Sequence, residues 1–311
     1  MINKEDYMEP RCPLCEAPYG AEADIKPVPQ QRIRDKMDEY MAKRDYAGAE
    51  RHLLYWLEEA KLGHDLRGQL MLRNELVGHY RKTGDRDKAI SNGEEALRLV
   101  DVLDFGRTVS AGTTYVNYAT ACSAFGENEK ALELFERARA VYEREMPPER
   151  GSTEAGAGEN TAPGQADGEM EPSGAASPGA GTSPELLGGL YNNMALACAA
   201  LGRYDEALEL YGRATEQMTK VENGELEQAI TCLNMADTLT ARDGDAVQEN
   251  EINALLDRAE ALLDTPEIPR DGYYAFVCEK CAPSFEYYGY FLTAQSLKDR
   301  AEEIYLTELH E

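Results

Sequence analysis

Residues 190–214 read LYNNMALACAALGRYDEALELYGRA and predict two helices joined by a turn at Gly202. Small and apolar side chains recur at helical spacing on both sides of this glycine. Because small residues let two helices approach closely and large ones fill the space beside them, the stretch predicts a helical hairpin. Asn192 and Asn193 do not fit this packing, since adjacent positions on a helix cannot both face one core.

The same pattern recurs in three earlier stretches of the chain. In each stretch the first helix holds a small or apolar core residue, here called the anchor, and a second core residue three positions later. The second helix adds core residues twelve, sixteen and nineteen positions after the anchor. The aligned sets are Ala195, Cys198, Ala207, Tyr211, Ala214; Ala119, Cys122, Ala131, Phe135, Ala138; Val77, Tyr80, Ala89, Gly93, Ala96; and Met37, Tyr40, Ala49, Leu53, Trp56. Two weaker units follow, with Ala236 and Ala282 in their first helices.

Three of the turns also share a G-x-x-x-x-A spacing, which begins at Gly84, Gly126 and Gly202. With these anchors the chain resembles the tetratricopeptide repeat (TPR) family of helix–turn–helix units. The anchors are spaced by roughly 40–42 residues rather than the basic 34, and together with the NNMA sequence this spacing resembles the kinesin-light-chain type of repeat. The resemblance implies an all-α, right-handed α-solenoid of about six hairpins.

Composition divides the chain into four parts. Residues 1–29 form an arm with five prolines, 30–146 hold units one to three, and 185–311 hold units four to six. Residues 147–184 are rich in Gly, Ala, Pro, Ser and Glu, so they cannot bury enough apolar surface and are predicted to be disordered. The array either continues across this insertion or is joined by it as two half-arrays. We favour continuation, because units three and four have ordinary core positions and would bury each other.

Charge and cysteine usage limit the possible partners and the compartment. The net charge of −26 over 311 residues argues against nucleic acid and anionic membranes, which require basic patches. No stretch approaches ~18 uninterrupted apolar residues, so no membrane span is predicted. The chain shows no signal peptide, and its seven scattered cysteines do not resemble a disulfide framework, so the cytoplasm is the expected location.

The candidate site lies on the first helices, which line the concave surface in stacked hairpins of this kind. An asparagine occurs two or three positions before the anchor in units two to five: Asn74, Asn117, Asn192, Asn193 and Asn234. An amide both donates and accepts, so a row of amides can hold the main chain of an extended peptide. The TPR resemblance implies the same role. The alternative is that these amides bond neighbouring helices and make the stack rigid.

Basic residues on the first helix of unit two, Arg73 and Arg81, are further candidates. Arginine suits an acidic segment or a carboxylate of a bound peptide. The alternative for both is ordinary pairing with nearby glutamates on a solvated face.

Two C-x-x-C pairs, Cys12/Cys15 and Cys278/Cys281, could together hold zinc as four thiolates. Units one and six should lie roughly 50 Å apart at about 10 Å per helix layer. The arm could only just span that distance at ~3.3 Å per residue. No metal or other cofactor is therefore expected, and a zinc-stabilised scaffold is kept as an alternative.

No catalytic arrangement is visible, because the four histidines are scattered and no phosphate-binding or nucleophile motif occurs. The sequence predicts a non-enzymatic module that binds an extended peptide or a partner helix. A second interpretation is a regulatory protein that senses a small peptide. The aromatic cluster from Tyr273 to Phe291 is expected to cap the end of the array, or else to form an exposed patch for a partner.

Overall fold

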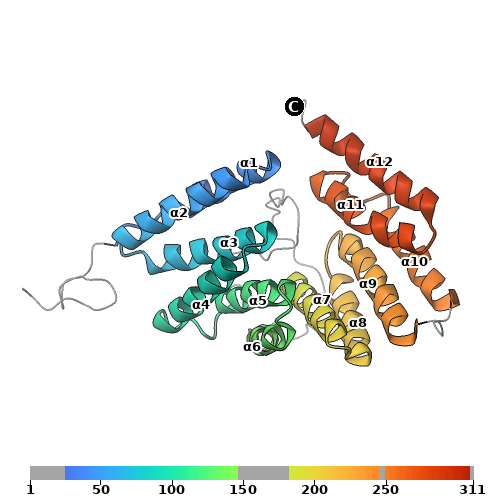
Figure 1. Ribbon diagram of the computed structural model, residues 1–311, viewed down its shortest axis with the longest axis horizontal. Helices are drawn as coiled ribbons and strands as arrows, with labels where there is room; N and C mark the ends of the chain where they lie inside the picture. Colours follow the sequence, from blue (N-terminus) through green and yellow to red (C-terminus); the bar gives the residue numbers. More distant parts are fainter. Residues whose placement is uncertain (1–24, 146–181, 245–248, 309–311) are drawn as a thin grey trace, which may run out of the picture. The chain divides into compact units, whose positions relative to one another are not determined.

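The computed structural model describes residues 25–145, 182–244 and 249–308, and every regular element in these ranges is an α-helix (Figure 1). Successive helices pair into hairpins, so the predicted all-α stack of helical hairpins is confirmed. The helices are α1 Gln30–Ala42, α2 Tyr46–Leu62, α3 Leu66–Thr83, α4 Arg86–Val102, α5 Val109–Ala124, α6 Asn128–Glu145, α7 Pro184–Ala200, α8 Tyr204–Met218, α9 Glu225–Asp243, α10 Glu249–Leu263, α11 Gly272–Tyr287 and α12 Phe291–Glu308. None of these helices is long and apolar enough to cross a membrane.

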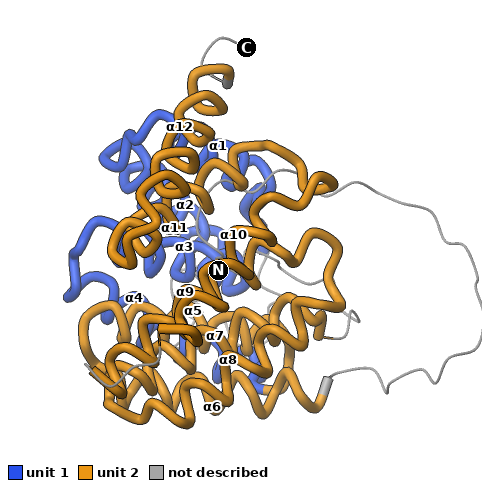
Figure 2. Tube along the Cα trace, turned by 90° about the vertical axis from the view of Figure 1, so that its right-hand side faces the viewer, with its two compact units in different colours: residues 1–106 blue, residues 107–311 orange. Residues whose placement is uncertain are grey.

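The chain forms two compact units, residues 1–106 with α1–α4 and residues 107–311 with α5–α12 (Figure 2). The division therefore follows the second hairpin and does not coincide with the insertion at 147–184. Within the second unit α6 packs against α7, and the Tyr191 hydroxyl donates to the Glu143 carboxylate over 3.0 Å. The stack thus continues from the third hairpin to the fourth, while residues 146–181 of the insertion lie outside the described residues.

The five hairpin turns that lie wholly within the described residues share one hydrogen-bonding pattern. Gly84, Gly126 and Gly202 adopt the left-handed conformation, with φ of 78°, 80° and 74°, and Gly289 in the last hairpin has φ of 85°. The residue after each glycine donates its amide to the carbonyl five positions earlier, which closes the helix end in a Schellman-type turn. In the first hairpin Arg44 takes the left-handed position, with φ of 53°.

The repeat anchors form the core that the alignment predicts. Ala119, Ala195 and Ala236 are fully buried on the first helices, and the alanines that follow the turns are buried in the same way. Tyr40 and Trp56 of the first hairpin are half-buried, because they lie at the start of the stack. Close approach within a hairpin needs small residues: a Cβ added at Gly112 of α5 would lie 2.2 Å from the ring of Tyr142 on α6.

The described end of the N-terminal arm is fixed to the turn between α2 and α3. The Lys26 amide donates to the Gly63 carbonyl over 2.8 Å, and the Val28 amide donates to Asp65 Oδ2 over 2.9 Å. Asp65 also caps α3, since its Oδ1 accepts from the Gly68 amide over 2.8 Å. One buried carboxylate therefore both starts a helix and holds the incoming chain.

Candidate functional site

Three of the candidate amides occupy the same repeat position on successive first helices of the second unit. Asn117 lies on α5, Asn193 on α7 and Asn234 on α9, each two residues before its anchor, and all three are half-buried. Within this unit α5 packs against α7, and α7 packs against α9. The sequence therefore predicted correctly that these amides belong to equivalent positions of adjoining helices, but the structure gives them different surroundings.

The amides of Asn192 and Asn234 bond to each other. Asn234 Nδ2 donates to Asn192 Oδ1 over 3.2 Å, and the Thr231 hydroxyl approaches the same oxygen at 3.4 Å. Thr231 is buried on α9 and makes its shorter bond, 2.8 Å, to the Glu227 carbonyl of its own helix. This pair thus joins the fourth hairpin to the fifth, which is the alternative that the sequence analysis left open for the amide row.

Asn117 and Asn193 differ, because their side chains form no hydrogen bond with any other described residue. The alignment supplies the reason for Asn193. Asn234 bonds to Asn192, which lies three positions before the anchor of the preceding repeat. For Asn193, the residue at that position of the preceding repeat is Val116. Val116 is 4% exposed and has no side-chain acceptor. Asn193 therefore keeps its donor and its acceptor available on the face of α7.

Arg73, a candidate of the first unit, is engaged within its own hairpin. Arg73 Nη1 donates to Asn92 Oδ1 over 2.6 Å, and Asn92 Nδ2 donates in turn to the Lys88 carbonyl over 2.8 Å. Burial lowers the pKa of the Arg73 guanidinium from its ordinary value. Asn74 and Arg81 are half-buried on the same helix and also have interaction partners. The structure thus gives Arg73 a packing role between α3 and α4.

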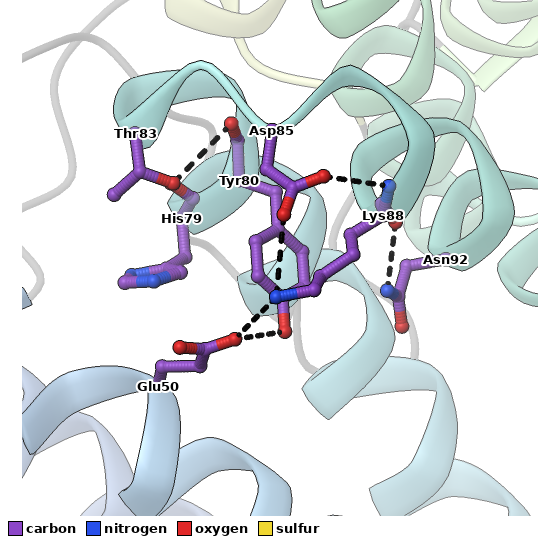
Figure 3. Close-up of polar contacts among 7 residues, drawn as sticks. All are labelled: Glu50, His79, Tyr80, Thr83, Asp85, Lys88 and Asn92. Atoms are coloured by element: carbon purple, nitrogen blue, oxygen red, sulfur yellow. Dashed lines mark hydrogen bonds and ion pairs between the residues drawn. The ribbon is translucent and has the colours of Figure 1, made fainter. Parts of the chain in front are cut away.

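A polar cluster that the sequence did not reveal joins the first hairpin to the second (Figure 3). Glu50 of α2 accepts from the Tyr80 hydroxyl over 2.8 Å and from Lys88 Nζ over 2.9 Å. Lys88 also pairs with Asp85 at 3.2 Å and lies 4.8 Å from the centre of the Tyr80 ring. The hydrogen bond from Lys88 is the main cause that lowers the Glu50 pKa, while burial is the main cause that raises the Tyr80 pKa to about 12. These contacts stabilise the packing of the first hairpin against the second.

The candidate zinc ligands that the structure describes are core residues. Cys278 and Cys281 are fully buried on α11. Burial raises the pKa of both thiols, that of Cys281 to about 12. Among the described residues no group of three or more metal-ligating side chains occurs, and Cys12 and Cys15 lie outside them.

The aromatic cluster near the C-terminal end divides between core and surface. Tyr274 and Phe285 are fully buried, while Tyr287 and Phe291 are 72% and 66% exposed. Tyr273 contributes differently, because its hydroxyl donates over 2.6 Å to Glu227 and so ties α11 to α9. Part of the cluster therefore completes the core of the last hairpin, and another part remains accessible at the turn between α11 and α12.

Comparisons with known proteins give one family and several solved structures. Residues 69–144 and 186–248 match the model of the tetratricopeptide repeat. The putative kinesin light chain TPR-like repeats of Podosopora anserina are 17% identical, with 78% of this chain and 98% of that chain covered and a TM-score of 0.45. BtubC (BKLC) of P. vanneervenii is 16% identical, with 92% and 94% covered and a TM-score of 0.44. The TPR2AB domain of yeast Sti1, solved with pHSP90, is 14% identical over 74% and 98%, with a TM-score of 0.29. No curated protein matches this chain.

Proposed function

Because residues 69–144 and 186–248 match the model of the tetratricopeptide repeat, we propose that this chain is a non-enzymatic module that binds an extended peptide of a partner protein on the face of α5 and α7. Stacked repeats of this kind present long surfaces and are commonly protein-interaction modules. The observation that carries the proposal is the pair Asn117 and Asn193, which occupy equivalent positions on adjoining helices and whose amides have no partner in the described residues.

The chemistry of an amide fits the main chain of a peptide. Each residue of an extended peptide offers one N–H and one C=O, and a single asparagine side chain can satisfy both. Since Asn117 and Asn193 are half-buried, their hydrogen bonds would form where water competes less than at an open surface. Such contacts give affinity without reading the peptide's side chains, so specificity must come from neighbouring parts of the surface.

The partner class and the compartment follow from the same features. The net charge of −26 favours a protein or peptide ligand over nucleic acid or an anionic membrane. The five described cysteines are free and buried, in agreement with a reducing cytoplasm as the proposed location.

The test compares two pairs of asparagines. A peptide is first selected on the full chain from a display library, and its Kd is measured by fluorescence polarisation. Asn117→Ala with Asn193→Ala should weaken binding about tenfold, at about 1 kcal/mol or less for each hydrogen bond, with little change in stability. Asn192→Ala with Asn234→Ala is the matched control, because it removes the same two side chains from the same face.

The control pair should instead lower the free energy of unfolding by about 1–3 kcal/mol, because it breaks the bond between α7 and α9. Its effect on the peptide Kd should be small. If the control pair abolishes binding while the first pair leaves the Kd unchanged, the free amides do not hold the ligand and the proposal is wrong.

A further inference from the structure

A cleft of about 210 Å³ lies at the beginnings of α7, α9 and α11 in the second unit. Its apolar wall includes Met218, Leu226 and Ile268. Ligand pockets for drug-sized molecules usually measure roughly 300–1,000 Å³. The cleft therefore suits a single side chain better than a whole small molecule.

The polar rim of the cleft is acidic. The residues that line the cleft include four acidic ones, Glu185, Glu222, Glu227 and Asp271, and none is lysine or arginine. The Asp271 carboxylate also caps α11, since it accepts from the Tyr274 amide over 3.1 Å. The positive ends of α7, α9 and α11 offset part of this charge, but each is worth only about half an elementary charge. The carboxylates exceed this compensation, so the cleft is negative.

We propose that this cleft binds the side chain of an arginine in the partner peptide. The aliphatic part of the side chain would pack on Met218, Leu226 and Ile268, and the guanidinium would meet the carboxylates of the rim. Arginine fits better than lysine because its planar group is weakly hydrated and can bond to more than one carboxylate at once. The inference rests on the proposed function, since it names a side chain of the same peptide, but it concerns different residues from Asn117 and Asn193.

Glu227 is the carboxylate that most needs a cation. It is half-buried in the first turn of α9 and accepts one hydrogen bond, of 2.6 Å, from the Tyr273 hydroxyl of α11. Burial raises its pKa, and the charges of Glu185 on α7 and Glu225 on α9 raise it further. Glu222 and Asp271 also line the cleft and are acidic, so they supply no cation for Glu227. A guanidinium would favour the ionised form, so binding should strengthen as the pH rises through the pKa of Glu227.

The experiment uses the full chain with ¹³C-labelled methionine methyl groups. Met218 is 2% exposed and lines the cleft, so its methyl signal reports on occupancy. The probes are N-acetyl-arginine N-methylamide and N-acetyl-citrulline N-methylamide, which has nearly the same shape but no charge. The arginine probe should shift the Met218 signal in a saturable way, and the citrulline probe should not.

Variants and pH test the named carboxylate. Glu227→Gln should weaken the arginine probe about fivefold to tenfold, because it removes the charge and keeps an acceptor for Tyr273. Glu302→Gln is the control, since it makes the same change of charge at an exposed position of α12. In the wild-type chain the affinity should fall as the pH is lowered through the pKa of Glu227, which lies above its ordinary value of 4.5.

Two results would overturn the inference. One is equal binding of the two probes, which would remove charge as the basis of recognition. The other is an equal loss of affinity in Glu227→Gln and Glu302→Gln, which would show general attraction to an acidic protein. Because the probe comparison needs no variant, it holds even if Glu227→Gln folds poorly. If peptide binding depends on Asn117 and Asn193 but the arginine probe does not shift the Met218 signal, only the inference about the cleft is wrong. If the probe shifts the Met218 signal but peptide binding does not depend on the two asparagines, only the proposed amide contacts are wrong.

Discussion

Val116→Asn should transfer the amide bridge to the preceding pair of helices. Asn234 bonds to Asn192, the residue three positions before the anchor of the preceding repeat. Val116 holds that position before Asn193, and an asparagine there would offer Asn193 the same acceptor. In the variant the Asn193 amide, which we propose for ligand binding, should therefore be hydrogen-bonded to residue 116. No other residue of the face is altered.

The stability of Val116→Asn relative to Val116→Ala shows whether the new bridge forms. Val116→Ala removes two buried methyl groups at roughly 0.8 kcal/mol each, plus a cavity term, so it should cost about 2 kcal/mol. Val116→Asn loses similar apolar burial but recovers about 1 kcal/mol if the new bridge forms. Without the bridge the buried amide would be unsatisfied, and the variant should fall about 1–3 kcal/mol below Val116→Ala.

Urea unfolding and fluorescence polarisation with the selected peptide measure the two effects together. Val116→Asn should be at least as stable as Val116→Ala and should weaken the peptide about as much as Asn193→Ala does, whereas Val116→Ala should bind almost normally. Adding Asn193→Ala to each variant completes a double-mutant cycle for the new bond. A Val116→Asn chain that is the least stable of the set and binds like wild type would refute the positional rule.

Gly112→Ala on α5 would place a methyl group 2.2 Å from a buried tyrosine ring, so it should lower the free energy of unfolding by about 1–3 kcal/mol. Gly212→Ala on α8 meets nothing within 4 Å and should raise the free energy of unfolding by about 0.5–1 kcal/mol in the same urea assay. Asp65→Ala should cost about 1–2 kcal/mol more than Asp45→Ala, because Asp65 caps a helix and also holds the arm, while Asp45 only caps; equal urea midpoints would argue against the second bond. The pKa of Glu50 is lowered in the folded chain, so its stabilisation is full above its ordinary value of 4.5 and is lost as the pH falls further. The difference in urea midpoint between wild type and Glu50→Gln should therefore shrink from pH 7 to pH 3.5, and a constant difference would contradict this assignment.

The repeat alignment predicts the hairpins well, because small anchors such as Ala119 and turn glycines such as Gly202 are required wherever two helices pack closely. The alignment also places Asn117, Asn193 and Asn234 at one position of the repeat. It does not say which of them is already bonded, since this depends on the residue that the preceding helix presents. Reading the alignment across neighbouring repeats, rather than within each, could have identified Val116 as the difference.

Other features depend on pairs that no local pattern contains. The contact of Glu50 with Tyr80 and Lys88 joins residues from two hairpins, and each of them alone resembles an ordinary surface or core residue. The acidic cleft is formed by the beginnings of three helices and the loops before them. The position of the division between the two compact units, after residue 106, also has no signal in composition.

The direct packing of α6 against α7 means that a continuous polypeptide is not needed to bring these two helices together. A chain cut between residues 146 and 181 would yield two fragments whose pairing follows mass action through this contact. Asn117 would lie on one fragment and Asn193 on the other. The proposed peptide site would then exist only in the reassembled pair. Peptide binding by the cut protein would therefore show that both fragments are present in the same compartment.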